Sequence, residues 1–191
     1  MPQTPEFNKW DKSQKKLVKG IYEWVEAAVF SLLCVSVIFT FLFRIVGVNG
    51  NSMYDTLQSG ERLVISRFLY TPKRGDIVII NRYRYNQEPL VKRIIAVGGD
   101  TLEIDEDTFE VKVNGKTLKE PYIVGVTKPI DYQNEYKDKP IPEGYVFVMG
   151  DNREESRDSR FMYDIGLVRE EDIIGKALFR FYPISRAGGL Y

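Results

Sequence analysis

The 191-residue chain contains no histidine, and this absence restricts the chemistry available to it. The Ser-His-Asp and Cys-His arrangements that activate most serine and cysteine nucleophiles are excluded. A lysine is then the main residue left to accept the proton of a serine hydroxyl. The sequence offers one such couple, Ser52 in the segment GNSMYDTL and Lys92, forty residues later, in LVKRIIAVGGD.

Cysteine and excess charge are also missing. The single cysteine, Cys34, lies in an apolar run, so neither a disulfide framework nor a thiolate zinc site can form within one chain. A metal site would need carboxylates alone, and we expect neither a metal nor a cofactor. Lysine plus arginine and aspartate plus glutamate number 27 each. Because nucleic-acid binding relies on a basic surface, we expect no nucleic-acid partner.

One long apolar segment is present. Residues 27–43, AAVFSLLCVSVIFTFLF, carry no charge, and apolar residues extend the segment on both sides. A bilayer core of about 30 Å needs roughly 20 helical residues, so we predict a transmembrane helix over residues 25–46. The alternative is a cleaved signal peptide. The long charged region before the segment and the lack of an A-x-A pattern after it favour an uncleaved anchor.

The charges that flank this segment predict its orientation. On the far side only Arg44 occurs before Arg62, whereas five lysines precede the segment: Lys9, Lys12, Lys15, Lys16 and Lys19. By the positive-inside rule, residues 1–24 are cytoplasmic. Residues 47–191 then form an extracytoplasmic domain of a single-pass protein of the plasma membrane.

The rest of the chain has the pattern of a β-sheet protein. Segments rich in Val, Ile, Phe and Tyr are separated by Gly, Asp, Asn and Pro, which predicts a mainly β, antiparallel fold. These segments are ERLVISRF, GDIVIINRY, LVKRIIAV, TLEI, FEVKV, KTLK, GYVFVMG and IIGKALFRFY. Asn114-Gly115 predicts a two-residue hairpin turn. Residues 120–144 hold four of the nine prolines and predict an exposed connecting loop, with a substrate-contacting flap as the alternative.

Four motifs occur in order behind the apolar segment. They are SMYDTL (52–57), RGDIVII (74–80), VKRIIAVGGD (91–100) and GDNREESRDSR (150–160). With them the chain resembles the type I signal peptidases of bacteria, in particular the short single-anchor form of Gram-positive organisms. The resemblance implies an antiparallel β-sheet catalytic domain of the signal peptidase type. It also implies removal of signal peptides from secreted precursors after small residues at −3 and −1, by a membrane-bound enzyme that we expect to be monomeric.

The resemblance also assigns the chemistry. It implies that Ser52 attacks the scissile carbonyl and that Lys92, in its neutral form, is the general base. An exposed lysine has a pKa near 10.4, so the amine must be desolvated to lower its pKa toward the working pH. Alternation along a strand places Arg93 on the opposite face from Lys92, and we expect Arg93 to matter far less. The main oxyanion donor that the resemblance implies is the backbone N–H of Ser52. Some relatives add a hydroxyl two residues earlier, but this chain has Gly50 there, so a second donor cannot be that side chain.

Supporting residues follow from the last motif. Ser156 matches the position whose hydroxyl bonds to the lysine amine. Asp158 and Arg160 match a structural pair, and we expect Asp151 and Arg153 to brace the same loop. The alternative is that these charges are ordinary solvated surface groups.

Substrate binding is expected by strand addition between residues 48–52 and 89–92. The residues assigned to this groove are Val48, Asn49, Gly50, Met53, Leu57, Leu90 and Val91, and its apolar members are equally plausible as ordinary core. The chain departs from the family pattern at Asp55, which replaces a proline, at Ala96 and Gly98, and in a longer stretch over 160–166.

Two other functions are compatible with parts of this pattern. The first is a catalytically silent membrane-anchored relative that binds precursors or pilus subunits, and retention of Ser52, Lys92 and Ser156 argues against it. The second is the class of self-cleaving repressors with a Ser-Lys couple. A spanning helix stands where their DNA-binding domain would be.

Overall fold

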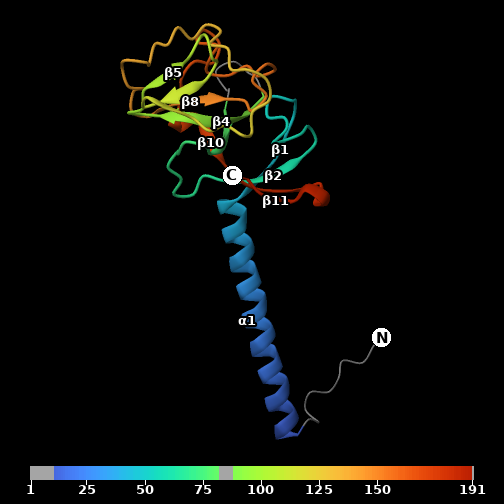
Figure 1. Ribbon diagram of the computed structural model, residues 1–191. Helices are drawn as coiled ribbons and strands as arrows, with labels where there is room; N and C mark the ends of the chain where they lie inside the picture. Colours follow the sequence, from blue (N-terminus) through green and yellow to red (C-terminus); the bar gives the residue numbers. More distant parts are fainter. Residues whose placement is uncertain (1–10, 82–87, 191) are drawn as a thin grey trace. The chain divides into compact units, whose positions relative to one another are not determined.

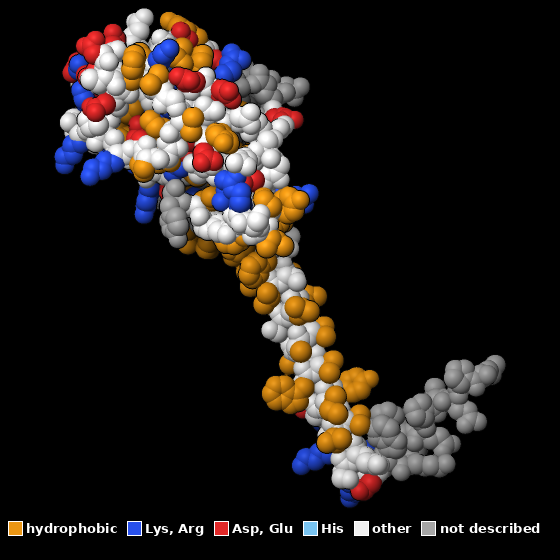
Figure 2. Space-filling view, turned by 45° about the vertical axis from the view of Figure 1, so that its right-hand side comes forward, with side chains coloured by type: hydrophobic (Ala, Val, Ile, Leu, Met, Phe, Trp, Pro, Cys, Tyr) orange, Lys and Arg blue, Asp and Glu red, His pale blue; other side chains and the backbone are white. Residues whose placement is uncertain are grey.

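The computed structural model describes residues 11–81 and 88–190, and the chain divides into two units at the Leu42–Phe43 bond (Figure 1). The first unit is a single helix, α1 (Lys12–Leu42), with no buried residue. Apolar side chains line most of the helix beyond its charged first turns (Figure 2). Among them, Trp24 and Phe41 are 80% and 81% exposed. The helix is long and apolar enough to cross a membrane.

The end of this helix differs from the predicted boundary. The sequence places residues 25–46 in one spanning segment, whereas α1 stops at Leu42 and Arg44–Gly47 form strand β1. Ile45 and Val46 are apolar and β-branched, so hydropathy alone does not distinguish a strand from the last turn of a spanning helix. Pairing of Ile45 with Val64 of β2 decides the outcome.

The second unit is built on one large antiparallel sheet, whose strand order is β1-β2-β10-β3-β4-β8-β9, with β11 paired to β10. The strands after β1 are β2 (Arg62–Ser66), β3 (Ile77–Ile80), β4 (Leu90–Val97), β8 (Tyr145–Met149), β9 (Val168–Arg169), β10 (Ile173–Tyr182) and β11 (Gly188–Gly189). Two 3₁₀ turns accompany them, η3 (Glu170–Asp172) and η4 (Ile184–Arg186). The mainly β, antiparallel prediction is confirmed.

A smaller sheet contains β5 (Leu102–Ile104), β6 (Val111–Val113) and β7 (Lys116–Thr117). The turn between β6 and β7 is Asn114-Gly115, with φ values of 52° and 72°. Positive φ at both central residues is what a two-residue hairpin turn requires, and glycine adopts it without strain. The predicted hairpin is therefore present.

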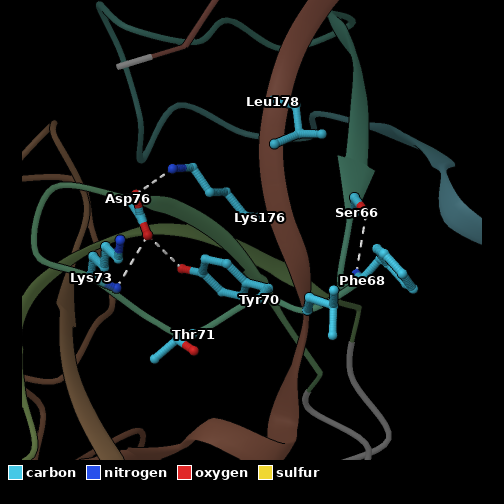
Figure 3. A pocket seen from close by; sticks show the side chains of 9 residues that line it. Ser66, Phe68, Tyr70, Thr71, Lys73, Asp76, Lys176 and Leu178 are labelled. Carbon is cyan, nitrogen blue, oxygen red and sulfur yellow. Dashed lines mark hydrogen bonds and ion pairs between the residues drawn. The ribbon is translucent and has the colours of Figure 1, made fainter.

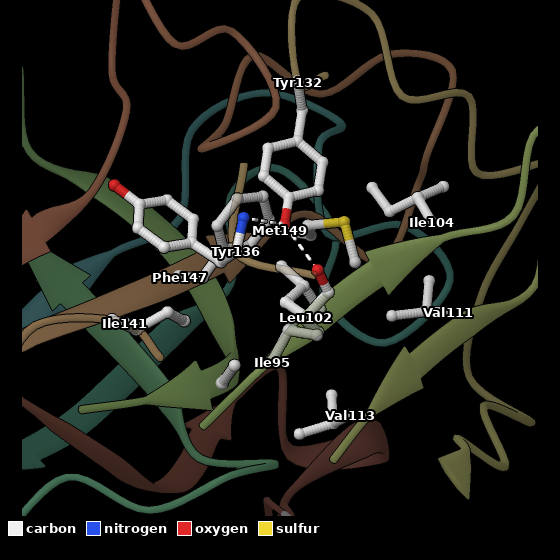
Figure 4. Close-up of a cluster of buried hydrophobic side chains, with 11 residues drawn as sticks. Ile95, Leu102, Ile104, Val111, Val113, Tyr132, Tyr136, Ile141, Phe147 and Met149 are labelled. Carbon is white, nitrogen blue, oxygen red and sulfur yellow. Dashed lines mark hydrogen bonds between the residues drawn. The ribbon is translucent and has the colours of Figure 1, made fainter. Parts of the chain in front are cut away.

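The connection over residues 120–144 is irregular, as predicted, but it is not simply exposed. Its Tyr132 is 1% exposed and packs with Tyr136 and Phe147 beside β5 and β6 (Figure 4). The Tyr132 hydroxyl donates to the Leu102 carbonyl at 2.6 Å, and burial raises its pKa. The connection therefore contributes side chains to the core, although its proline and charge content predicted an exposed loop.

Candidate active site

Ser52 lies in a tight turn over residues 51–57, between β1 and β2. This turn is here called the nucleophile turn, after the role that the sequence resemblance implies for Ser52. The Tyr54 N–H donates to the Asn51 carbonyl at 3.0 Å, and the Leu57 N–H donates to the Met53 carbonyl at 2.8 Å. Met53 and Leu57 are buried in a cluster shared with the large sheet. These contacts leave the Ser52 side chain half-buried on the turn.

Lys92 lies in β4, where it pairs with Val78 of β3. Six of the eight residues of β4 are buried, because the strand has packed neighbours on both faces. Lys92 itself is 1% exposed, and its Nζ donates to Ser52 Oγ at 2.6 Å. The structure thus brings together the two residues that the sequence analysis paired, forty positions apart.

The segment Gly150–Arg160, here called the signature loop, packs directly against the nucleophile turn. The Asn152 backbone N–H donates to the Ser52 carbonyl at 3.0 Å, and its side-chain amide donates to the Asn51 carbonyl at 3.3 Å. A Cβ atom on Gly150 would lie 2.3 Å from both the Ser52 carbonyl oxygen and Ser156 Oγ. Only glycine permits this approach.

Ser156 lies where the motif suggests, but not in the expected hydrogen bond. Its side chain is 3% exposed and packs against Gly150. In the part of the chain that the structure describes, Ser156 Oγ has no hydrogen-bond partner, so the bond predicted to the Lys92 amine is not formed. The hydroxyl is a buried polar group with unused bonding capacity, next to the nucleophile turn.

Arg93 lies on the opposite strand face from Lys92, as predicted, but it is only 2% exposed and makes several contacts. Its guanidinium donates two hydrogen bonds to Asp151, at 2.8 and 2.7 Å, and a third to the Gly75 carbonyl at 2.8 Å. The Tyr122 ring stacks 4.0 Å from the same guanidinium. The strand alternates as predicted, but the opposite face is also buried, so Arg93 ties β4 to the signature loop.

Three further charged residues of the signature loop, Arg153, Asp158 and Arg160, are buried as well, whereas its other charged residues are exposed. Arg160 donates to both carboxylate oxygens of Asp158, at 2.8 and 2.9 Å. Arg153 contacts Glu120 and Thr127 in the 120–144 connection. None of these arginines or aspartates is a solvated surface group, which removes the alternative considered for them.

Three residues that the sequence analysis did not single out join this network. The Thr56 hydroxyl donates to Asp151 at 2.6 Å, and Glu120 and Asn152 make the contacts described above. Thr56 and Asn152 lie within two of the four sequence motifs, and this position was a signal that could have identified both residues. Glu120 lies in the irregular connection, where local sequence offers none.

The predicted substrate-binding residues fall into two groups. Val48, Met53, Leu57 and Val91 belong to one buried apolar cluster, whereas Asn49 and Gly50 are exposed and Leu90 is half-buried. The Asn49 amide donates to Glu88 at 3.3 Å, so the segments on either side of the expected groove lie beside each other. Residues 90–92 pair with β3, while the β8 ladder starts at Arg93, so among the described strands none pairs with the other edge of residues 90–91.

A separate cavity of about 340 Å³ contains neither Ser52 nor Lys92 (Figure 3). Its central carboxylate, Asp76, accepts hydrogen bonds from the Tyr70 hydroxyl at 2.8 Å and from the Lys73 N–H at 3.1 Å. Lys176 lies 2.6 Å from the same carboxylate. Burial, followed by the hydrogen bond to Asp76, raises the pKa of Tyr70. These groups satisfy one another and offer no activated nucleophile.

Comparison with known proteins decides the family. A family profile described as signal peptidase, peptidase S26, matches residues 21–182. The chain belongs to this family. The S26 chain is 37% identical over 183 residues to signal peptidase I T of Bacillus subtilis strain 168, an alignment that covers 92% of each protein. It is 34% identical to signal peptidase IB of Staphylococcus aureus strain COL, over 87% of this chain and 92% of the relative.

A crystal structure of a signal peptidase I from Enterococcus faecalis V583 aligns with 56% of this S26 chain and 97% of its own, at 28% identity and a TM-score of 0.44. The family assignment rests on the profile and on the Bacillus relatives. This S26 member is an enzyme, a signal peptidase I of the serine peptidase class, as the sequence resemblance implied. The family's activity is the removal of signal peptides.

Proposed function

We propose that this S26 peptidase is a membrane-bound serine endopeptidase that removes signal peptides from secretory precursors with Ser52 as nucleophile and Lys92 as general base. The observation that carries the proposal is the 2.6 Å contact between Ser52 Oγ and the buried Lys92 Nζ. Burial removes hydration from an amine and favours its neutral form, and only the neutral amine accepts a proton. The silent-relative alternative gives no reason to keep this geometry.

The two residues suffice for a balanced acyl transfer. The Lys92 amine takes the Ser52 hydroxyl proton while Oγ bonds to the scissile carbonyl carbon, and the Ser52 N–H donates to the resulting oxyanion. As the C–N bond breaks, the Lys92 ammonium returns the proton to the leaving amine. A water then attacks the acyl carbonyl carbon while the same amine takes its proton, and the ammonium returns that proton to Ser52 Oγ as the acyl C–O bond breaks.

Substrate selection follows from the two segments beside the dyad. The edge of β4 opposite β3 at residues 90–91, which no strand of the described residues pairs, and the exposed Asn49–Gly50 backbone offer hydrogen bonds to an extended peptide. Val48, Met53, Leu57 and Val91 pack in one buried cluster, which leaves little room for a large side chain of a bound peptide. This packing supports cleavage after small residues at −3 and −1.

Helix α1 supports anchoring, and the lysines at its start support a cytoplasmic N-terminus. The catalytic domain is then extracytoplasmic. Ser52 follows Arg44 by eight positions, a span of at most about 26 Å when extended, so the nucleophile works close to the membrane surface. Precursors that are held in the membrane by their own signal peptides present their cleavage sites close to the same membrane surface.

The test uses the full chain in detergent micelles with a precursor that bears an A-x-A site, and the cut is mapped by mass spectrometry. Ser52→Ala and Lys92→Arg are expected to lower kcat/KM by about 1000-fold or more, because one deletes the nucleophile and the other replaces the base with a guanidinium that stays protonated. Lys112→Arg, on the small sheet, is the matched control. For the wild type, kcat/KM rises with pH through an apparent pKa below 10.4, since the base is active only when neutral. Comparable cleavage by the wild type and Lys92→Arg would contradict the dyad and favour the binding relative.

A further inference from the structure

A second set of charged residues contacts the nucleophile turn from the side of the C-terminal strands. Arg180, near the end of β10, donates to the Thr56 carbonyl at 2.9 Å. Arg186, at the end of η4, donates to the Asp55 carbonyl at 3.2 Å. These carbonyls belong to the turn that carries Ser52, whereas neither arginine lies in any of the four sequence motifs.

Glu61 joins the two arginines. Its side chain is 3% exposed, and its two carboxylate oxygens lie 3.1 Å from Arg180 Nη1 and 3.1 Å from Arg186 Nη1. Arg180 Nε also donates to the Arg186 carbonyl at 2.6 Å. Charge-assisted hydrogen bonds of this kind are short and directional, and a planar guanidinium holds several acceptors in a fixed arrangement. We name Glu61, Arg180 and Arg186 the Glu61 cluster.

The Glu61 cluster also reaches the base of the loop that contains the turn. The Glu61 carbonyl accepts a hydrogen bond from the Val48 N–H at 2.8 Å, and the Gly60 N–H donates to the Val48 carbonyl at 2.9 Å. The same residue therefore closes the loop over 48–61 with its backbone and anchors two arginines with its side chain. The arginines in turn hold the loop at Asp55 and Thr56.

The nucleophile turn is thus held from two sides. The signature loop binds it through Asn152 and Asp151, and the Glu61 cluster binds its later carbonyls. We infer that the Glu61 cluster positions the nucleophile, keeping Ser52 Oγ at Lys92 Nζ and the Ser52 N–H in place for the oxyanion. This inference rests on the proposed dyad. The three residues are positioning residues, since they act through the turn.

Positioning and simple stabilisation predict different measurements. A stabilising role predicts a lower thermal midpoint with unchanged kinetic constants for the folded fraction. A positioning role predicts a lower kcat with an unchanged KM, because substrate binding is intact while the reacting atoms are misaligned. It also predicts slower covalent labelling of Ser52 by a small fluorophosphonate, a reaction that needs no substrate groove.

The decisive variant is Arg186→Met in the full chain, which keeps the apolar stem and removes the guanidinium. We expect kcat on the A-x-A precursor and the labelling rate of Ser52 each to fall by about tenfold, with KM changed less than about twofold. Arg169→Met is the control. It removes an arginine that pairs with two carboxylates, Glu171 and Asp172, at the β9 edge of the sheet, and it is expected to leave both rates unchanged.

Arg186→Lys provides a second variant. One ammonium cannot reproduce the guanidinium contacts to both Glu61 and Asp55, so an intermediate kcat is expected. A kcat within about twofold of the wild type for folded Arg186→Met would overturn the inference, as would an equal loss in Arg169→Met or a kcat of Arg186→Lys below that of Arg186→Met. Ser52→Ala separates the two hypotheses: residual cleavage by it refutes the dyad, whereas an inactive Ser52→Ala beside a fully active Arg186→Met refutes only the Glu61 cluster.

Discussion

Ion pairs in two regions of the catalytic domain differ in burial. In the signature loop, Arg93–Asp151 and Arg160–Asp158 have side chains no more than 2% exposed. Around the small sheet, Asp105–Lys112 and Glu103–Lys137 have side chains between 24% and 48% exposed. A buried charge that loses its partner is strongly destabilising, whereas an exposed pair contributes little. The same residue types therefore serve as rigid supports in one region and as replaceable surface groups in the other.

The largest effect is expected at Asp151. Asp151→Asn removes the charge that neutralises the buried Arg93 and weakens the acceptor for Thr56. Breaking one partner of a buried pair costs about 3 to 5 kcal/mol, so we expect a much lower thermal midpoint and loss of precursor cleavage. Calorimetry and the cleavage assay measure both. Replacement of the whole pair by Arg93→Met with Asp151→Leu should recover part of the stability; an Asp151→Asn variant as stable as the wild type would remove the distinction between the two regions.

A substitution at Ser156 tests the buried region around the signature loop without changing the charge of that region. Ser156→Ala removes a hydroxyl that is buried without a partner, so the thermal midpoint should stay the same or rise. If the hydroxyl aims the base during turnover, kcat falls by about tenfold, less than for Ser52→Ala. Wild-type kcat in Ser156→Ala would instead assign Ser156 to packing alone.

The smallest effect is expected at the small sheet. The Lys112 hydrogen bond, followed by those from Thr108, lowers the pKa of Asp105 from its ordinary value of 3.8. A carboxyl group whose pKa is lowered by folding stabilises the protein at pH values above its pKa in the unfolded state. This stabilisation is lost as the pH falls through its pKa in the folded state. Because the pair is exposed, Asp105→Asn should leave activity unchanged and the thermal midpoint at pH 7 within about 2 °C of wild type. A drop comparable to that of Asp151→Asn would show that burial does not separate the regions.

Local sequence patterns predicted most of the fold, and the sequence analysis paired Ser52 with Lys92, which lie 2.6 Å apart in the structure. Alternating and continuous apolar segments correspond to strands because their residues pack on one or both faces of a sheet, and Asn114-Gly115 marked a true hairpin. The missing histidine made a serine-lysine couple the expected chemistry, and the motif resemblance singled out Ser52 and Lys92 among the other serines and lysines. Local patterns failed at residues 44–46, where a strand and a spanning helix have the same hydropathy.

The supporting contacts were harder to predict because they join distant parts of the chain. Arg93 and Asp151 are 58 positions apart, and Thr56 and Asp151 are 95 apart. Strand alternation assigned Arg93 to the correct face but could not show that this face is also covered. Tyr132 and Glu120 were concealed in the same way, since the composition of residues 120–144 describes a loop and not what the loop packs against.

The close contact at Gly150 limits the directions in which the nucleophile turn can move. The Ser52 carbonyl and the Ser156 side chain already approach the Gly150 backbone so closely that no further atom fits between them. Any displacement of Ser52 during turnover must therefore run away from the signature loop or along it. The hydrogen bond from the Asn152 N–H to the Ser52 carbonyl opposes the outward direction. The close contact at Gly150 and the hydrogen bond from Asn152 together restrict the movement of Ser52, and with it the movement of the reacting oxygen.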